Sequence, residues 1–230
     1  MKLPLLASVP HAGWRVPEEA APFCILSPQE VLEDGDVGAS EIYALESEFE
    51  AYLTTDIARA IVDLNRAQDD RRPDGVVKTH TCWNVPVYRE LLPADVVEVL
   101  LNEYYHPYHE RLRELASTGV RCGVDLHTMA AKGPPIGPDP DVERPWVCLG
   151  NLDGTASPPD WIDILKDCFE KGFGANVRVN DPFKGGLITS SHAAELPWIQ
   201  VELSRGAHMS NEEKSAAVLN ALTLWCERIF

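Results

Sequence analysis

The chain has 230 residues, of which 45% are apolar, so it can bury a sizeable core, and we expect one compact domain spanning residues 1–230. Its 36 acidic and 20 basic residues give a formal net charge of -16, which argues against nucleic acid or an anionic membrane as a partner. An acidic substrate would therefore need individual arginines to hold it against the overall field.

Six cysteines are dispersed along the chain without a CxxC pair, and most of them lie in apolar runs: Cys24, Cys82, Cys122, Cys148, Cys168 and Cys226. This pattern favours reduced core thiols over disulfides or a thiolate metal site. The segment Leu3–Val9 is too short and too interrupted by proline for a signal peptide. No run reaches the roughly 18 apolar residues that a membrane span requires, so we expect a cytoplasmic protein.

The first predicted element is a buried strand over residues 3–9, which Pro10 ends and His11 follows. In an open α/β sheet, the carboxyl ends of the strands face the ligand crevice. His11 alone resembles an ordinary turn histidine. Its position after a strand and before Ala12-Gly13, which leave room for a ligand, makes it a candidate for chemistry.

An acidic segment, residues 33–38, precedes a predicted helix from about Ala39 to Leu53. Ile42, Leu45 and Phe49 supply the apolar stripe of this helix. Asp34 and Asp36 have two interpretations. They either cap the helix and complement its dipole, or one of them is a carboxylate metal ligand.

One or two helical turns over residues 55–59 lead into a predicted strand, Ile61–Leu64, after which Asn65 and Arg66 open a polar loop. The loop also contains Asp69, Asp70, Arg71 and Arg72. Solvated charges explain most of this loop. Arg66, however, directly follows a buried strand, where its guanidinium can bind a carboxylate with two hydrogen bonds.

Residues 79–88 are predicted to be irregular, and a long helix follows Pro93 with a kink at Pro107. Its inner face is formed by Val96, Val99, Leu100, Tyr104, Tyr108, Leu112 and Leu115. His106 and His109 lie three residues apart on this helix and can share one metal ion, although histidines satisfied within a helical core are commoner.

The central stretch is the predicted strand Val120–Thr128, in which an apolar run breaks into Asp125 and His127. Residues 132–140 follow and are too rich in proline and glycine for a helix or an inner strand. A loop of this kind inside a compact domain is either functional or mobile. We expect it to cover the cleft.

The remaining predicted elements are a strand (146–149), an amphipathic helix (161–170) that Gly172 can end, a short strand (177–179), a strand (198–203) and a last helix with a Ser210–Glu213 capping box. Lys184 and Gly185 lie in the turn 180–186, which is either simple turn chemistry or a backbone surface against substrate. In the strand 198–203, alternation places Glu202 opposite the apolar face, as a candidate general base.

Six pieces of the sequence, in the expected order, resemble the N-formylglutamate amidohydrolase family almost end to end: Val9-Pro10-His11-Ala12-Gly13, Asp63-Leu64-Asn65-Arg66, Tyr105-His106-Pro107-Tyr108-His109, Asp125-Leu126-His127-Thr128-Met129, Asn180-Asp181-Pro182-Phe183-Lys184-Gly185-Gly186 and Gln200-Val201-Glu202-Leu203. The family is similar in fold to the zinc carboxypeptidases and aspartoacylases. The resemblance therefore implies an α/β/α sandwich of three layers around a mixed, mostly parallel sheet.

The resemblance also implies roles for individual residues. His11 and His127 become metal ligands, Asn65 and Arg66 bind the substrate carboxylate, and Glu202 becomes the general base. Lys184, Gly185 and His109, from the other matching pieces, are candidates for substrate binding. In carboxypeptidases the acidic ligand comes three residues after the first histidine, but Trp14 stands there in this chain. Asp36 matches the family pattern best, with Asp34 and Glu41 as alternatives.

Zinc chemistry fits this set of residues. Three N/O ligands leave a fourth position open, zinc lowers the pKa of its bound water to about 7, and Glu202 can accept the proton. Arg71 or Arg72 is a candidate for stabilising the oxyanion. Imidazole and carboxylate ligands also suit nickel, iron or cobalt, so the sequence does not fix the metal.

We therefore predict a metal-dependent amidohydrolase that removes formyl, or another small acyl group, from the nitrogen of an acidic amino acid such as N-formylglutamate, as in histidine degradation. One alternative is a carboxypeptidase-like or deacylating hydrolase on another N-acyl amino acid or small peptide. Another is a non-catalytic relative that binds metal or ligand. The sequence leaves the oligomeric state open.

Overall fold

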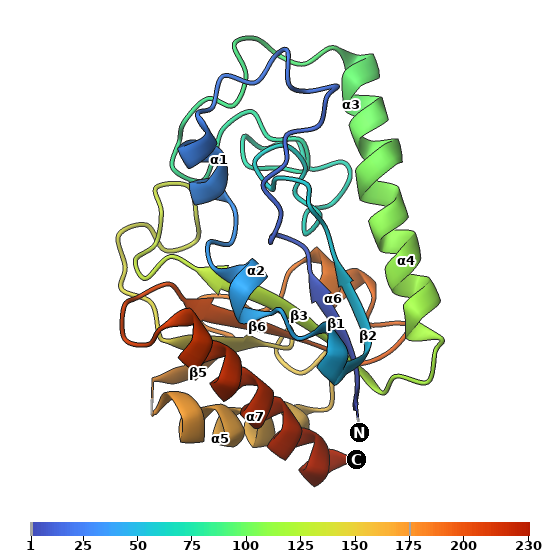
Figure 1. The fold of residues 1–230 in the computed structure, drawn as a ribbon, viewed down its shortest axis with the longest axis vertical. Coiled ribbons are helices and arrows are strands. Elements are labelled where there is room, and N and C mark those ends of the chain that lie inside the picture. The colour runs from blue at the N-terminus through green and yellow to red at the C-terminus, as the bar shows by residue number, and fades with distance from the viewer. Residues whose placement is uncertain (1, 175) are drawn as a thin grey trace.

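A computed structural model describes residues 2–174 and 176–230 and forms one six-stranded sheet in the order β2-β1-β3-β6-β4-β5 (Figure 1). The strands are β1 (Leu3–Val9), β2 (Phe49–Thr54), β3 (Cys122–Met129), β4 (Val147–Gly150), β5 (Val177–Val179) and β6 (Trp198–Ser204). Neighbouring strands pair in parallel except β4 and β6, which pair antiparallel. The predicted mixed, mostly parallel sheet is confirmed.

The helical elements are α1 (Pro28–Asp34), α2 (Ala39–Ile42), η1 (Glu46–Glu48), α3 (Ala94–Leu100), the π-helical η2 (Leu101–Tyr105), α4 (His106–Ala116), α5 (Pro159–Phe173), α6 (Leu187–Ser191) and α7 (Asn211–Ile229). Alternation along the strands divides the apolar side chains between two cores. On β1, Leu5 and Ala7 join one core with α5 and α7, whereas Leu6 joins the other with α4. Figure 1 shows α5 and α7 together on one side of the sheet and α3–α4 on the other, which gives the three predicted layers.

The predicted helix over residues 39–53 is wrong beyond its first turn. Helix α2 ends at Ile42, the single turn η1 follows, and Phe49 begins β2. Phe49 and Ala51 are buried and pair in register with β1, so strand pairing at the sheet edge decides the structure of a segment whose spacing also suits a helix.

The predicted helical turns over 55–59 and the strand over 61–64 are also wrong. This segment is a series of turns with isolated bridges, of which Val62 to Val77 is one. Its apolar side chains are nevertheless buried, because they pack in the second core with Tyr108 and Leu112 of α4. Because this segment is buried without pairing as a strand, its backbone can turn and direct Asp63 and Asn65 toward the sheet.

The long helix after Pro93 is present, and a π-helical turn that the sequence did not predict, η2, lies directly before His106 and Pro107. The His106 amide donates to the Leu101 carbonyl, five residues back, just before Pro107. Proline has no amide hydrogen for the regular bond, so a local change in winding is expected beside it. Of two further predictions about helix ends, one is confirmed and one is wrong. The Ser210–Glu213 capping box begins α7 as predicted, whereas α5 continues past Gly172 and ends at Phe173, with Gly174 as its C-cap.

All six cysteines are free thiols. Among the described helices, we find none with the length and apolar composition needed to cross a membrane.

Helix α4 contacts the residue that caps the end of α6 through a buried pair of histidines, His109 and His192. His109 Nε2 lies 3.0 Å from the Leu64 carbonyl and must donate to it, so Nδ1, at 2.9 Å, accepts from His192 Nε2. The other nitrogen of His192 lies 2.6 Å from Glu195. Burial and the neighbouring His192 lower the pKa of His109 to about 4, so the fold holds its neutral form.

This pair predicts a loss of stability in mild acid. Unfolded histidine titrates near pH 6.5, so between about pH 6.5 and 4 the unfolded chain binds a proton that native His109 does not. The free energy of unfolding should therefore fall over that window by up to roughly 3 kcal/mol. His109→Gln should have a shallower curve, measured by urea denaturation at several pH values. His106→Gln, at a half-buried position of the same helix, is the control variant. Parallel stability curves for wild type and H109Q would contradict the assignment.

Candidate active site

Three neighbouring strands deliver the central polar residues to one edge of the sheet. His11 lies just beyond the end of β1, His127 lies on β3 and Glu202 on β6. In the parallel pairing of β3 with β6, His127 stands opposite Glu202. The predicted arrangement of chemistry at the carboxyl ends of adjacent strands is therefore what the sheet produces.

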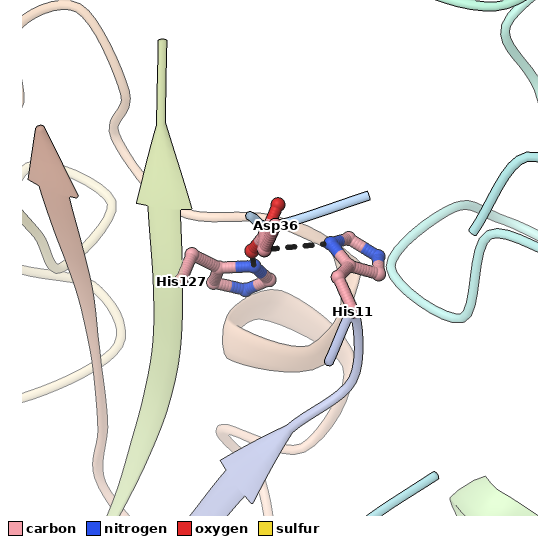
Figure 2. Close-up of side chains that lie close together, drawn as sticks. All are labelled: His11, Asp36 and His127. Carbon is pink, nitrogen blue, oxygen red and sulfur yellow. Dashed lines mark hydrogen bonds and ion pairs between the residues drawn. The ribbon is translucent and has the colours of Figure 1, made fainter. Parts of the chain in front are cut away.

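His11, Asp36 and His127 meet as a buried triad (Figure 2). The Asp36 Oδ2 atom lies 3.0 Å from His127 Nδ1 and 3.7 Å from His11 Nδ1. One nitrogen or oxygen from each side chain lies within 4.8 Å of the others. Burial alone would raise the pKa of Asp36, but the two histidines hold it well below its ordinary value.

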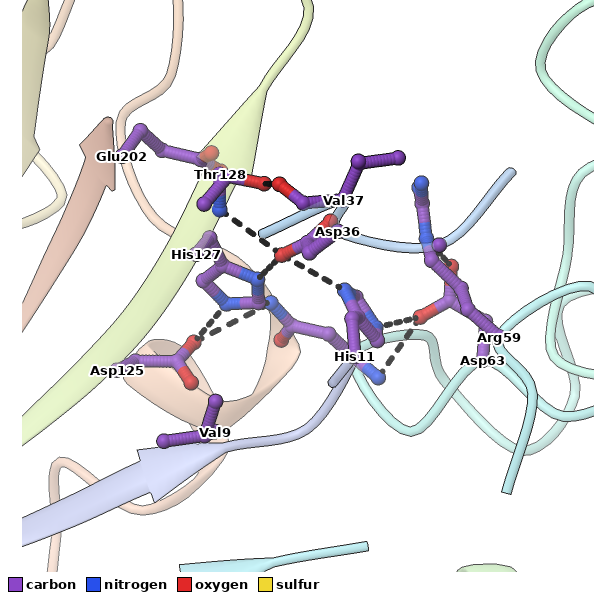
Figure 3. A network of polar contacts seen from close by, with 12 residues as sticks. Val9, His11, Asp36, Val37, Arg59, Asp63, Asp125, His127, Thr128 and Glu202 are labelled. Carbon is purple, nitrogen blue, oxygen red and sulfur yellow. Dashed lines mark hydrogen bonds and ion pairs between the residues drawn. The ribbon is translucent and has the colours of Figure 1, made fainter. Parts of the chain in front are cut away.

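A second carboxylate supports each histidine from behind (Figure 3). His11 Nε2 lies 2.8 Å from Asp63 Oδ1, and His127 Nε2 lies 2.9 Å from Asp125 Oδ2. Both aspartates are fully buried. A carboxylate behind a ring nitrogen keeps the proton on that nitrogen, so the Nδ1 atom of each histidine, on the Asp36 side, would be the one to bind a metal ion.

This donor set fits a divalent metal ion. Two imidazole nitrogens and a carboxylate oxygen are ligands that catalytic zinc uses, and the carboxylates behind the histidines are the usual outer partners of such ligands. The other acidic candidates lie elsewhere. Asp34 is bound by Lys78 Nζ and the Cys82 amide, and Glu41 binds Asn211 on the surface.

Arg205, just after β6, holds the segment that carries Asp36. Its Nη2 atom lies 2.5 Å from the Gly35 carbonyl, 3.1 Å from the Thr128 carbonyl and 3.4 Å from Asp36 Oδ1. The Thr128 amide donates to Asp36 Oδ2 at 3.1 Å. The acidic residue is thus fixed against β3 by contacts from a distant part of the chain.

Glu202 is buried in the same cavity as the triad. Gln200, two residues earlier on the same face of β6, donates to its Oε1 atom at 2.8 Å. Burial raises the pKa of Glu202, and the nearby His127 opposes that shift. Figure 3 places Glu202 beside Thr128 and His127 on the β3 side of the triad.

The cavity above these residues has a volume of about 560 Å³. Part of its wall comes from the loop 132–140, through Pro134, Ile136, Gly137 and Pro138. The Ile136 amide donates to the Cys82 carbonyl, which joins this loop to another wall residue. Gly133 is required where the loop folds back, because a Cβ there would collide with Asp139. The loop that we expected to cover the cleft therefore forms part of the cavity wall.

The predicted arginines differ in position. Arg66 lines the cavity and binds Asp74. Arg72 also lines it, but its side chain is 63% exposed and binds Asp70. Arg71 is exposed and does not contribute to the lining. An oxyanion is best stabilised by a fixed donor away from water, which neither Arg71 nor Arg72 offers.

Asn65 lines the cavity and is also hydrogen-bonded to the residues at its centre. Its Nδ2 atom donates to Asp125 at 3.2 Å, and its Oδ1 accepts from the Ile188 amide at 2.8 Å. Gly186 packs so closely on this amide that a Cβ would collide with it. Gly185 lines the cavity, whereas Lys184 binds the exposed Asp153 outside it. His109 is not among the residues that line the cavity and pairs with His192.

Sequence reasoning assigned no role to Asp63, Asp125, Arg59 or Arg205. Asp125 carried a usable signal, since it stands two residues before His127 and therefore shares its face of the strand. Arg59 lines the cavity and binds Asp63 Oδ2 at 3.1 Å. The same carboxylate binds His11 through Oδ1, so Asp63 links Arg59 to His11. No local pattern marks Arg59, because its position depends on turns formed by packing.

Comparisons with known proteins agree on one family. The sequence model of N-formylglutamate amidohydrolase matches residues 3–209. The N-formylglutamate deformylase of Pseudomonas putida is 27% identical over 228 residues, covering 92% of this chain and 84% of that protein.

Two crystal structures share the fold. N-formylglutamate amidohydrolase from Ralstonia eutropha JMP134 has a TM-score of 0.80 at 24% identity, over 99% of this chain and 93% of that one. Gene product Atu2144 from Agrobacterium tumefaciens has a TM-score of 0.75 at 17% identity, over 99% and 89%.

The support behind His127 can be tested with Asp125→Asn. An asparagine amide can donate to His127 Nε2, which would favour the tautomer with the proton on Nδ1 and block the nitrogen that would bind the ion. We expect zinc affinity, measured by chelator competition, to fall by about 10–100-fold. Ser8→Ala is the matched control, because Ser8 donates to the other oxygen of Asp125. If S8A and D125N bind zinc equally well, the tautomer argument is wrong.

Proposed function

Because the chain belongs to the N-formylglutamate amidohydrolase family, we propose that it hydrolyses the N-formyl or another small N-acyl group of an acidic amino acid, with a divalent metal ion as cofactor. The observation that carries this proposal is the meeting of His11, Asp36 and His127 in one buried triad, with Glu202 opposite His127 in the register of β3 and β6. The named relatives support the substrate: one is a deformylase and another an amidohydrolase of N-formylglutamate.

The three side chains of the triad would hold the ion, for which zinc is the first candidate. When bound, the ion supplies Lewis acidity, which eases loss of a proton from water and polarises the formyl carbonyl. Water retains access through the cavity that the triad lines.

Glu202 is the residue we assign to proton transfer. Its carboxylate accepts the proton of the attacking water and then delivers it to the amide nitrogen as the carbon–nitrogen bond breaks. The products are formate and the free amino acid. Burial, which raises the pKa of Glu202, favours this exchange because it brings the acid and base forms closer in energy.

Two arginines complete the proposal. Arg59 would stabilise the negative charge that develops on the formyl oxygen, since its side chain is mostly buried and Asp63 links it to His11. Arg66 would bind the α-carboxylate of the substrate. Asn65, whose amide is occupied by Asp125 and the Ile188 backbone, acts here by positioning rather than by direct contact.

The role of Glu202 predicts a clean separation of turnover from metal binding. Glu202→Gln keeps the shape of the side chain but removes the proton acceptor, so kcat for N-formyl-L-glutamate should fall at least 100-fold while zinc content is unchanged. Formate release and metal analysis measure the two effects. Glu41→Gln, on the surface, should behave like wild type. Near-normal kcat in E202Q would refute the assignment.

The loop 132–140 should contribute to substrate binding. Replacing Pro134–Pro138 by a shorter glycine-serine link removes part of the cavity wall and the Ile136 contact with Cys82. We expect KM for N-formyl-L-glutamate to rise about tenfold or more, because the substrate loses the contacts that this part of the wall would make. Unchanged kinetics in a variant with wild-type melting temperature would remove the loop from substrate binding.

A further inference from the structure

Arg144 is a buried cavity residue that the chemistry proposed above does not use. It follows the loop 132–140, lines the cavity, and has a side chain that is only 5% exposed. Its Nε and Nη2 atoms bind Asp139 at 2.8 and 2.6 Å. Within residues 2–174 and 176–230, its Nη1 atom makes no hydrogen bond, so this edge of the guanidinium is available to a ligand.

The guanidinium is also held in place. It lies 4.8 Å from the centre of the Phe183 ring, and the Arg144 amide donates to the Ala131 carbonyl. Asp139 fixes its plane with two bonds. A fixed planar guanidinium loses little side-chain entropy when it binds a further carboxylate.

The charges of the proposed substrate require such a group. An N-acyl derivative of glutamate or aspartate carries two carboxylates, and Arg66 accounts for one of them. Arg72 is a poor partner for the second because water screens an arginine that is 63% exposed. Arg144 comes from a different segment of the wall than Arg66, so the two cations can hold two separate anionic groups of one molecule.

We infer that Arg144 is the specificity-determining residue for an acidic side chain, and that its Nη1 edge binds the side-chain carboxylate of the N-acyl amino acid. This inference rests on the proposed function. It explains how a protein of net charge -16 binds a dianionic substrate, since a buried guanidinium donates hydrogen bonds to a carboxylate at close range, whereas surface charge is distant and screened.

The test compares N-formyl-L-glutamate with its neutral isostere N-formyl-L-glutamine. Wild type should prefer the acid in kcat/KM. Arg144→Gln should reduce that preference by about 10–100-fold, mainly through KM for the acid, because a charge-assisted hydrogen bond is lost for that compound alone. Arg144→Lys should restore part of the preference.

Two controls separate recognition from loop structure. Lys132→Gln removes an ion pair of the same loop, with Asp141, but leaves Arg144 and Asp139 in place, so it should change both substrates by a similar factor. Arg178→Gln removes an exposed arginine that also pairs with an aspartate, and should leave the preference unchanged. If R144Q lowers kcat/KM equally for both compounds, Arg144 has only a structural role and the inference is wrong.

Failure of the proposed function would have a different signature. If wild type releases formate from neither compound, the hydrolytic proposal fails. Calorimetric binding of the same two compounds to the zinc-loaded wild type and to R144Q then tests Arg144 directly. Tighter binding of the acid by wild type, lost in R144Q, supports the inference, and equal binding by both proteins overturns it.

Discussion

The need to compensate one buried carboxylate, Asp63, organises the site. Its Oδ1 atom accepts from His11 Nε2 at 2.8 Å and from the backbone amide of Asn65 at 3.0 Å, while Oδ2 accepts from Arg59 Nε at 3.1 Å. The buried Lys78 ammonium lies 3.8 Å away. A charge without partners in the interior costs several kcal/mol, so these segments must converge for the chain to fold. Their convergence carries the first histidine and a cation to the cavity without a regular element between residues 55 and 93.

The local sequence pattern was sufficient to predict the candidate site residues that lie on strands or at their ends. An apolar run that breaks at a strand end identified His11 and His127, and alternation along residues 198–203 turned Glu202 away from the apolar face. These signals depend only on neighbours in sequence, which is why they survived errors elsewhere. The helix expected over 39–53 failed because parallel pairing with β1, a contact between distant residues, outweighs a helical spacing that Phe49 also satisfies.

Residues placed by long-range contacts could not be found in this way. The choice among Asp36, Asp34 and Glu41 depends on Lys78, Asn211 and Arg205, which are up to 170 positions away in the hydrogen-bonded pairs. In the sequence, nothing distinguishes Arg144 from other charged residues near loops. Its contacts with Asp139 and Phe183 appear only in the structure. The resemblance to a family supplied part of what the pattern lacked, but it gave no sign that the Asn65 side chain also binds Asp125 and the Ile188 backbone.

Each cavity arginine has its own aspartate: Arg59 with Asp63, Arg66 with Asp74, Arg72 with Asp70, Arg144 with Asp139 and Arg205 with Asp36. A ring of five unneutralised guanidinium groups would repel itself and would exist only while an anion occupied it. Local neutralisation removes that dependence. The empty protein can therefore keep its pocket assembled between turnovers, and product can leave without a collapse of the walls around it.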